Sequence, residues 1–216
     1  MTVLQAEIFS DIVCPWCYIG HERLKKAATL RPDIALQRSW HPFQLNPDMP
    51  FEGMDRGAYM TWKFGTQGRA ERLTEALMAT AKRDGIDLRL NQVKRVPSTL
   101  RAHRLVSYAG RQGLATAMME ALFTAYFTEC VDIGDIDILA ERAEAVGLGR
   151  RETALYLESE EDAAWVAEHD IRARRSGIDG VPCFVFGRRY AVVGAEEPES
   201  FLPLFDAAVV AQQAAE

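Results

Sequence analysis

Two cysteines separated by Pro-Trp, Cys14 and Cys17, directly follow the first strand-like segment of the chain, residues 2–10. The residues after the motif, 17–31, have helical spacing of their apolar side chains and end before a proline. Residues 34–43 alternate again and predict a second strand. The motif therefore lies at the first strand-to-helix junction of a β-α-β unit, and this position constrains the fold more than any other feature.

Three kinds of chemistry fit two cysteines at this spacing: a zinc half-site, a structural disulfide or a redox dithiol. A closed zinc site needs four ligands, but Cys130, Cys183 and the four histidines are isolated in the sequence. A disulfide between such near neighbours would close a very small loop and constrain little of the unfolded chain. A C-x-x-C within a β-α-β unit is typical of a thioredoxin-like redox site, and we favour that interpretation.

The helix start assigns the two thiols different roles. Cys14 would lie at the helix N-terminus, where free N–H groups and the positive end of the helix dipole stabilise a thiolate, so it is the expected nucleophile. Cys17, one turn further along, could attack a mixed disulfide on Cys14 and is the expected resolving thiol. Pro15 suits a first helical turn, and Trp16 supplies apolar surface without adding a positive charge.

The remainder of the chain has a helical block between two strand-containing ends. Helical periodicity runs from about residue 55 to residue 177, and strand signals return at 181–186 and 190–194 around a Gly-Arg-Arg turn. A final helix follows. We therefore expect an α/β fold of the thioredoxin type, with a large all-helical insertion between a β-α-β half and a β-β-α half. The expected domains are residues 1–54 with 178–216, and residues 55–177.

Composition and charge exclude several classes of protein. The chain has 216 residues, 48% of them hydrophobic, and it carries a net charge of -6. An acidic chain is a poor general nucleic-acid binder. Its start lacks the cationic and apolar regions of a secretory signal, and no stretch is apolar enough for a membrane helix. With only four cysteines, we expect a cytoplasmic protein without a nucleic-acid or membrane partner.

A second motif, Gly-Val-Pro, runs into the strand that begins at about residue 181. Pro182 cannot donate a hydrogen bond to a sheet, so it belongs at the first residue of a strand or on an edge. Most X-Pro bonds in folded proteins are trans, and base rates alone predict a trans bond here. Each half of the chain therefore carries one motif: the cysteine pair in the N-terminal half and Gly-Val-Pro in the C-terminal half.

Together these segments resemble a known family. "DIVCPWCYIG", "PFQLNPDMP", "AHRL", "AYFTE" and "GVPCFVFGRRYAVVGAEEPE" are similar to the DsbA-like thioredoxin-fold family, and within it to the cytoplasmic FrnE-like thiol-disulfide oxidoreductases. The resemblance runs over nearly the entire chain. It implies a thioredoxin fold with a helical insertion, a cis peptide before Pro182 facing the Cys14–Cys17 pair, and pairing of the substrate backbone beside Val181.

The chain departs from the family pattern at two cysteines. Cys183 and Cys130 stand where the family has a large apolar residue and a glycine, respectively. Cys183 could be a third redox thiol, but a buried free cysteine usually behaves as a small hydrophobe, and we favour that interpretation. His103, in "AHRL", could relay a proton or orient substrate, although a hydrogen-bonded structural histidine is the simpler interpretation. We expect His21 to be partly exposed.

The leading functional hypothesis is a thiol-disulfide oxidoreductase, acting as reductase or isomerase on protein or small-molecule disulfides. Its expected partners are that substrate and a thiol reductant such as glutathione or thioredoxin. The chain indicates no metal and no organic cofactor, because it has no Gly-rich nucleotide loop, although glutathione remains a candidate co-substrate.

Two alternatives remain. One is a glutathione-dependent isomerase or transferase, similar to the 2-hydroxychromene-2-carboxylate isomerases and kappa-class glutathione transferases, which commonly carry Ser where this chain has Cys14. The other is a non-catalytic holdase, which has no need of a cysteine pair.

Overall fold

The computed structural model describes residues 1–65 and 67–214, apart from the side chain of Gln67. The chain forms two compact units, residues 1–43 with 168–216 and residues 44–167. These compact units have their limits at residues 43 and 168, and the domain boundaries expected at 54 and 178 stay a prediction. Within the first unit, the guanidinium of Arg174, near the end of a helix, lies 4.1 Å from the ring centroid of Phe43.

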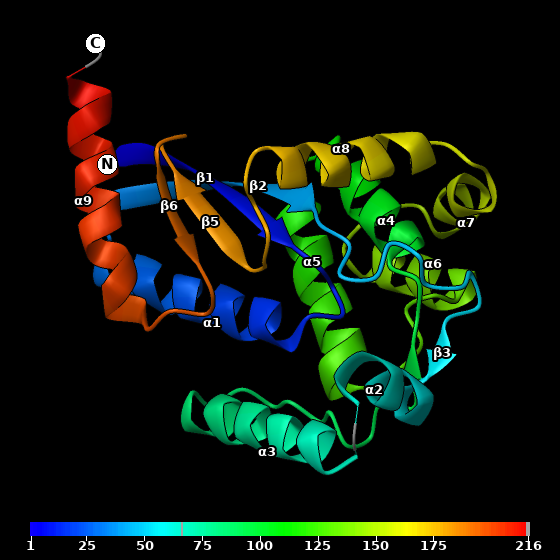
Figure 1. The fold of residues 1–216 in the computed structure, drawn as a ribbon. Helices are drawn as coiled ribbons and strands as arrows, with labels where there is room; N and C mark the ends of the chain where they lie inside the picture. The colour runs from blue at the N-terminus through cyan, green and yellow to red at the C-terminus, as the bar shows by residue number, and fades with distance from the viewer. Residues whose placement is uncertain (66, 215–216) are drawn as a thin grey trace. The chain divides into compact units, whose positions relative to one another are not determined.

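A four-stranded sheet forms the centre of the first unit (Figure 1), in the order β2-β1-β5-β6. β1 pairs in parallel with β2, and the β1–β5 and β5–β6 pairs are antiparallel. This arrangement of a β-α-β half and a β-β-α half is the thioredoxin fold that the sequence predicted. The elements are β1 (Thr2–Ser10), α1 (Pro15–Leu30), β2 (Ile34–Pro42), β5 (Cys183–Phe186), β6 (Tyr190–Val193), the 3₁₀ turn η2 (Pro198–Phe201) and α9 (Leu202–Gln213).

One face of this sheet packs against α1 and α9 to form the core. Alternate residues of β1 turn to this face because successive side chains of a strand point to opposite sides. Phe184 and Phe186 of β5 meet Phe201 and Phe205 edge to face, with ring centroids 5.2 and 5.0 Å apart in the closest pairs. The fully buried members of this core are Leu4, Ala6, Ile8, Leu24, Ala27, Phe184, Phe186, Phe201, Phe205 and Ala208.

The second unit is mostly helical but not entirely so. A short antiparallel ladder joins β3 to β4, which corrects the expectation of an all-helical insertion. Each strand has two residues, too few to leave an alternating pattern in the sequence. The elements are β3 (Met54–Asp55), α2 (Arg56–Phe64), α3 (Gln67–Arg83), β4 (Arg95–Val96), α4 (Leu100–Gly110), α5 (Ala115–Phe123), the π-helical turn η1 (Thr124–Thr128), α6 (Ile136–Ala145) and α7 (Arg150–Glu158); α8 (Ala163–Arg175) leads back to the first unit.

A buried arginine ties α4 to the end of α7. The guanidinium of Arg104 donates hydrogen bonds to the carbonyl oxygens of Tyr156, Leu157, Ser159 and Glu161, at 2.6 to 3.2 Å. Carbonyl groups at a helix end have no partner within the helix, and these bonds supply one. Arg104 therefore has a structural role that its position next to His103 in the sequence did not reveal.

Candidate active site

Cys14 lies in the connection between β1 and α1, directly before the first residue of α1. Its backbone is extended, with φ −86° and ψ 111°, and its amide donates a hydrogen bond to the carbonyl oxygen of Asp11 at 3.1 Å. The carbonyl of Cys14 accepts bonds from the amides of Cys17 and Tyr18, and Pro15 is the first helical residue. Cys14 is thus the N-cap residue of α1, at the helix end whose free N–H groups favour a negative charge.

Cys17 lies within the first turn of α1 and is only 1% exposed. Burial raises the pKa of its thiol well above the usual value, and a hydrogen bond to Cys14 and the charge of Cys14 raise the pKa further. The hydroxyl of Ser10 and the backbone of Asp11 act in the opposite direction. Cys17 therefore keeps its proton near neutral pH. The different roles expected for Cys14 and Cys17 stay a prediction.

Ser10 and Asp11 are site residues that sequence reasoning missed. They lie between β1 and the cysteine motif, and they are 2% and 0% exposed. Polar residues are seldom so completely buried unless they have partners or a function. Two polar residues at the end of an apolar strand, directly before a C-x-x-C, were a signal that could have identified them.

The segment before β5 lies against Cys14. The Sγ atom of Cys14 is 3.7 Å from the carbonyl oxygen of Val181, and the Val181–Pro182 peptide bond is cis. A Cβ atom at Gly20 of α1 would lie 2.9 Å from Cγ of Pro182, which shows how closely this segment packs on the helix. The carbonyl of Pro182 accepts a hydrogen bond from Gly194 at 2.8 Å. These contacts bring the two sequence motifs together.

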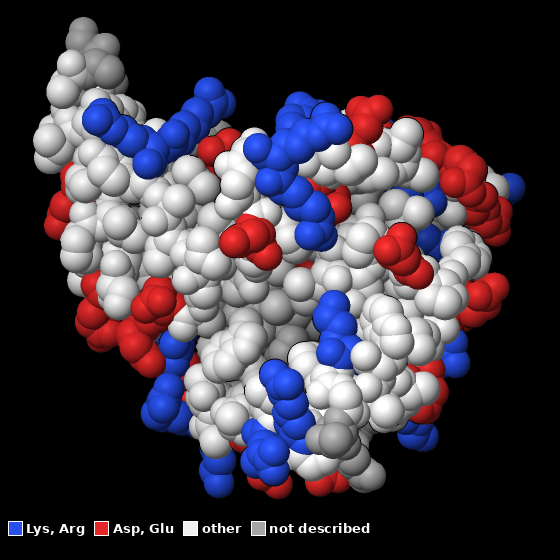
Figure 2. Space-filling model, in the orientation of Figure 1, with Lys and Arg blue, Asp and Glu red and all other residues white. Residues whose placement is uncertain are grey.

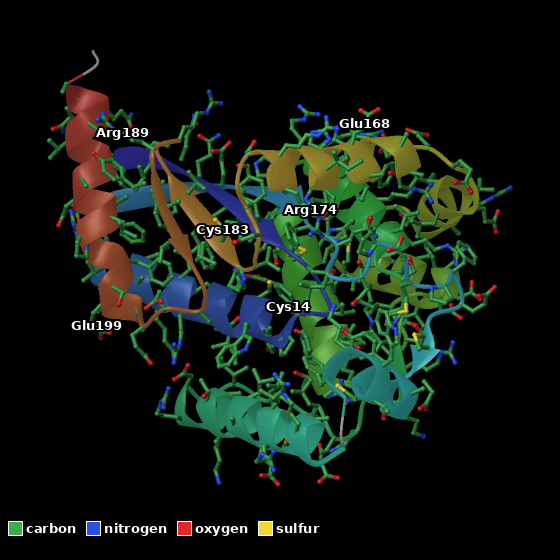
Figure 3. The ribbon with its side chains drawn as sticks, viewed as in Figure 1. Cys14, Glu168, Arg174, Cys183, Arg189 and Glu199 are labelled. Carbon is green, nitrogen blue, oxygen red and sulfur yellow. The ribbon has the colours of Figure 1, made fainter. Side chains whose placement is uncertain are left out.

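Cys183 follows Pro182 but turns away from the pair. It is the first residue of β5, and its neighbour Phe184 points into the core beneath α1. Because strand side chains alternate, Cys183 faces the other side of the sheet; Figure 3 shows it on β5 and Cys14 at the start of α1. Cys183 is 2% exposed, and burial, followed by the charge of Asp179, raises the pKa of its thiol.

The other residues singled out from the sequence have different surroundings. Trp16 is 40% exposed beside Cys14 and presents apolar surface. His21 is 1% exposed, so the prediction of partial exposure was wrong; its ring packs against Trp40, with centroids 5.2 Å apart. His103 belongs to α4 in the second unit, where it is buried and its amide donates to the carbonyl of Thr99. A role for His103 in the chemistry stays a prediction.

All four cysteines carry free thiols. Among the residues described, no three His, Cys, Asp or Glu side chains are placed to share a metal ion. In the same part of the chain, no helix has both the length and the apolar character needed to span a bilayer.

Surface charge is mixed on the face that Figure 2 presents. Acidic and basic side chains are interspersed there, and the turn between β5 and β6 carries the exposed Arg188 and Arg189. Figure 3 shows Arg189 near α9, at the far end of β5 from Cys183. Nucleic-acid binding proteins are typically recognised by a broad basic stripe, and the described residues of this face form none.

The chain is similar in sequence and in fold to known proteins. The family model described as "DSBA-like thioredoxin domain" matches residues 5–205. An uncharacterized protein of Bacillus subtilis is 29% identical over 198 residues, which are 87% of this chain and 88% of that protein. A probable DsbA oxidoreductase from Streptomyces coelicolor is 30% identical, with a TM-score of 0.85 over 95% of this chain and 89% of that one.

A 2-hydroxychromene-2-carboxylate isomerase shares the fold. It is 18% identical to this chain, with a TM-score of 0.69, and 98% of each chain is covered. The same fold thus carries proteins named as oxidoreductase and as isomerase, so the chemistry has to be argued from the residues of the site.

Proposed function

Because this chain belongs to the DSBA-like thioredoxin domain family, we propose that it is a thiol-disulfide oxidoreductase with Cys14 and Cys17 as its redox pair. One observation supports the proposal above all. Cys14 is the N-cap residue of α1, and its sulfur lies 3.7 Å from the Val181 carbonyl oxygen, with a second thiol one turn inside the helix. An isomerase that only binds glutathione needs one thiol-orienting group and has no use for the second cysteine.

In the first step, the thiolate of Cys14 attacks one sulfur of a substrate disulfide. A Cys14–substrate disulfide forms, the substrate S–S bond breaks, and the other substrate sulfur leaves as a thiolate that takes a proton from solvent. The attacking thiolate belongs to the N-cap residue of α1, where the positive end of the helix dipole stabilises a negative charge. Cys17 stays protonated during this step, since burial and Cys14 both raise its pKa.

In the second step, Cys17 attacks the sulfur of Cys14 and expels the substrate. Once Cys14 is part of a mixed disulfide it carries no charge, so its charge no longer raises the pKa of Cys17. Cys17 then loses its proton more readily, a Cys14–Cys17 disulfide forms, and the second substrate sulfur leaves as a thiol. The net result is a reduced substrate and an oxidised enzyme, and the reverse sequence oxidises a dithiol.

Substrate would be held beside Val181 and Trp16. An extended chain can pair with backbone groups next to Val181, and the half-exposed ring of Trp16 offers apolar surface close to the reacting sulfur. In this scheme Pro182 helps to fix the substrate-binding segment against α1. Cys183 takes no part, because it faces the opposite side of the sheet.

The cycle closes when a thiol reductant reduces the Cys14–Cys17 disulfide. Glutathione or thioredoxin would serve, and neither a metal nor an organic cofactor enters the scheme. We propose a cytoplasmic location from the low number of cysteines. In a reducing compartment such a pair would rest as the dithiol and act as a reductase or isomerase, with the direction set by its reduction potential.

The test is turnover in the reduction of insulin disulfides by dithiothreitol. We expect the wild type to accelerate the reaction and Cys14→Ser to abolish the acceleration, while Cys17→Ser accumulates mixed disulfides. Glutathione binding to wild type and Cys14→Ser, measured in parallel, addresses the isomerase alternative. Saturable binding that survives Cys14→Ser, without insulin turnover by the wild type, would contradict the proposal. A holdase would protect unfolded clients equally well with and without Cys14.

A further inference from the structure

The hydroxyl of Ser10 is a buried polar group that the folded chain leaves unsatisfied. Ser10 is 2% exposed, and its Oγ atom has no hydrogen-bond partner among residues 1–65 and 67–214. Most buried hydroxyls do have a partner, because losing hydration without gaining a hydrogen bond destabilises the folded protein. The position of Ser10 in the fold shows which group its side chain faces.

Ser10 is the last member of the row of β1 side chains that faces α1. Successive side chains of a strand point to opposite sides of the sheet. The alternate residues from Leu4 to Ile8 pack in the core with Leu24 of α1. Ser10 is the next residue of this row, at the C-terminal end of the strand. Its hydroxyl therefore lies on the side of the sheet that α1 covers.

Cys17 is the first member of the matching row on α1. It precedes Leu24 by about two helical turns, so both side chains lie on the same buried face of the helix. β1 and α1 run in opposite directions (Figure 1), and the end of β1 leads directly into the start of α1. The last residue of the strand row, Ser10, consequently faces the first residue of the helix row, Cys17.

The acidity of Cys17 agrees with this placement. Burial raises the pKa of its thiol, as do a hydrogen bond to Cys14 and the charge of Cys14, whereas a hydrogen bond from the Ser10 side chain lowers it. A hydroxyl lowers the pKa of a thiol when it donates to the thiolate. Asp11 acts in the same direction, but through its backbone. The unsatisfied hydroxyl of Ser10 is thus placed to gain its partner when Cys17 loses its proton.

We propose that the Ser10 hydroxyl donates a hydrogen bond to the Cys17 thiolate in the second step of the reaction. This inference rests on the proposed function and adds a residue to it. Cys17 releases its proton to solvent, and its sulfur attacks the Cys14 sulfur while the bond between Cys14 and the substrate sulfur breaks. The substrate sulfur leaves with the bonding electron pair and takes up a proton. Ser10 keeps its own proton throughout.

The test follows the Cys14–glutathione adduct after the reduced protein is mixed with oxidised glutathione between pH 6 and 10, by acid quench and mass spectrometry. Ser10→Ala should form the adduct at the wild-type rate, since this step needs only the Cys14 thiolate. At pH 7 the variant should lose the adduct about three- to tenfold more slowly, because less Cys17 is ionised. A less stabilised thiolate is more nucleophilic, so the difference from wild type should shrink as pH rises.

Stability separates this role from a structural one. Removing a buried hydroxyl without a partner should leave the urea midpoint of unfolding unchanged or raise it. Thr153→Val is the matched control. Thr153 of α7 is 0% exposed, and its hydroxyl also has no partner within the part of the chain that the structure describes, but it belongs to the second unit. This control should lose the adduct at the wild-type rate, and Ser10→Thr, which retains the donor, should keep the wild-type pH dependence.

A second measurement does not depend on turnover. In a Cys14→Ser background, the carbon-13 NMR signal of the Cys17 Cβ atom reports the titration of its thiol. Adding Ser10→Ala should move the midpoint of this titration to higher pH by about one to two units, the effect of losing a hydrogen bond to a charged acceptor. The midpoints of Cys130 and Cys183 should stay where they are.

An unchanged Cys17 midpoint, an equal slowing of adduct loss at every pH, or the same slowing in Thr153→Val would overturn the proposal. A Ser10→Ala variant that did not fold would overturn it as well, because the hydroxyl would then be structural. Failure of the proposed function has a different signature: the wild type would form no Cys14 adduct or would never lose it. The NMR titration would still decide whether Ser10 stabilises the Cys17 thiolate.

Discussion

The sulfur of Cys14 lies 3.7 Å from the carbonyl oxygen of Val181, although 167 positions separate the two residues in the chain. The register of the sheet creates this contact. β5 pairs with β1 from Phe9↔Cys183 onward, so the residues just before β5 reach the same end of the sheet as the residues just after β1. The two ends of the chain thus form one site because they share one sheet.

Gly20→Ala tests how tightly the helix that carries the cysteines packs on the Pro182 segment. An added Cβ would lie 2.9 Å from Cγ of Pro182 and 3.2 Å from Cζ of Phe184. Overpacking of this kind typically costs about 1–3 kcal/mol, and we expect that loss in the free energy of unfolding by urea. Gly68→Ala is the control, because its nearest atom is 3.8 Å away; it should be neutral or slightly stabilising. Equal stability of the two variants would refute the packing argument.

The raised pKa of Cys17 predicts that the free energy of unfolding of the reduced protein falls at alkaline pH. Its pKa is raised in the folded state, so below the pKa of the unfolded thiol both states hold the proton and pH has no effect through this group. At higher pH the unfolded chain loses the proton first, and stability falls as pH rises toward the folded pKa. The slope can reach about 1.4 kcal/mol per pH unit. Unfolding titrations between pH 7 and 10 should show a steeper fall for wild type than for Cys17→Ala; parallel curves would contradict it.

Replacing Arg23 should destabilise the protein more than replacing its ion-pair partner Glu197. It is 4% exposed and donates to the carbonyl of Ala195 at 2.6 Å and to Glu197 at 2.7 Å, whereas the Glu197 side chain is 55% exposed. Arg23→Met should cost about 2–4 kcal/mol, since it removes the donor to a part-buried carbonyl. Glu197→Gln should cost about 1 kcal/mol or less. Chemical denaturation measures both, and equal losses would show that the surface ion pair dominates.

Cys183→Ala separates the cysteine beside Pro182 from the redox pair. Its side chain faces away from α1, so we expect insulin turnover within about twofold of wild type, a difference of less than about 0.5 kcal/mol in the barrier. The assay is the same reduction of insulin by dithiothreitol. A tenfold loss of turnover with unchanged thermal stability would show that a third thiol takes part.

Local patterns made the first half of the sheet predictable. The alternation in β1 and β2 and the helical spacing between them arise from neighbouring residues. β3 and β4 were not predicted because each has two residues, which pair only through tertiary contacts. His21 was misjudged although it lies four residues after Cys17 and therefore shares the buried face of that helix; the charged Glu22 and Arg23 follow it in the sequence.

The candidate site was only partly predictable for the same reason. Cys14, Cys17 and Pro182 belong to recognisable motifs, and the structure brings them together at one end of the sheet. The effect of Ser10 and Asp11 on the Cys17 thiol depends on the turn between β1 and α1, whose geometry no spacing rule specifies.

The most direct test of the central claim is to trap the first intermediate. Cys17→Ser, reduced and then mixed with oxidised glutathione, should form one stable glutathione adduct that peptide mapping assigns to Cys14. Wild type should lose the adduct as the Cys14–Cys17 disulfide forms, and Cys14→Ser should form none. An adduct on Cys130 or Cys183 in place of Cys14, or the same persistent Cys14 adduct in the wild type, would contradict the assignment of Cys14 as attacking thiol and Cys17 as resolving thiol.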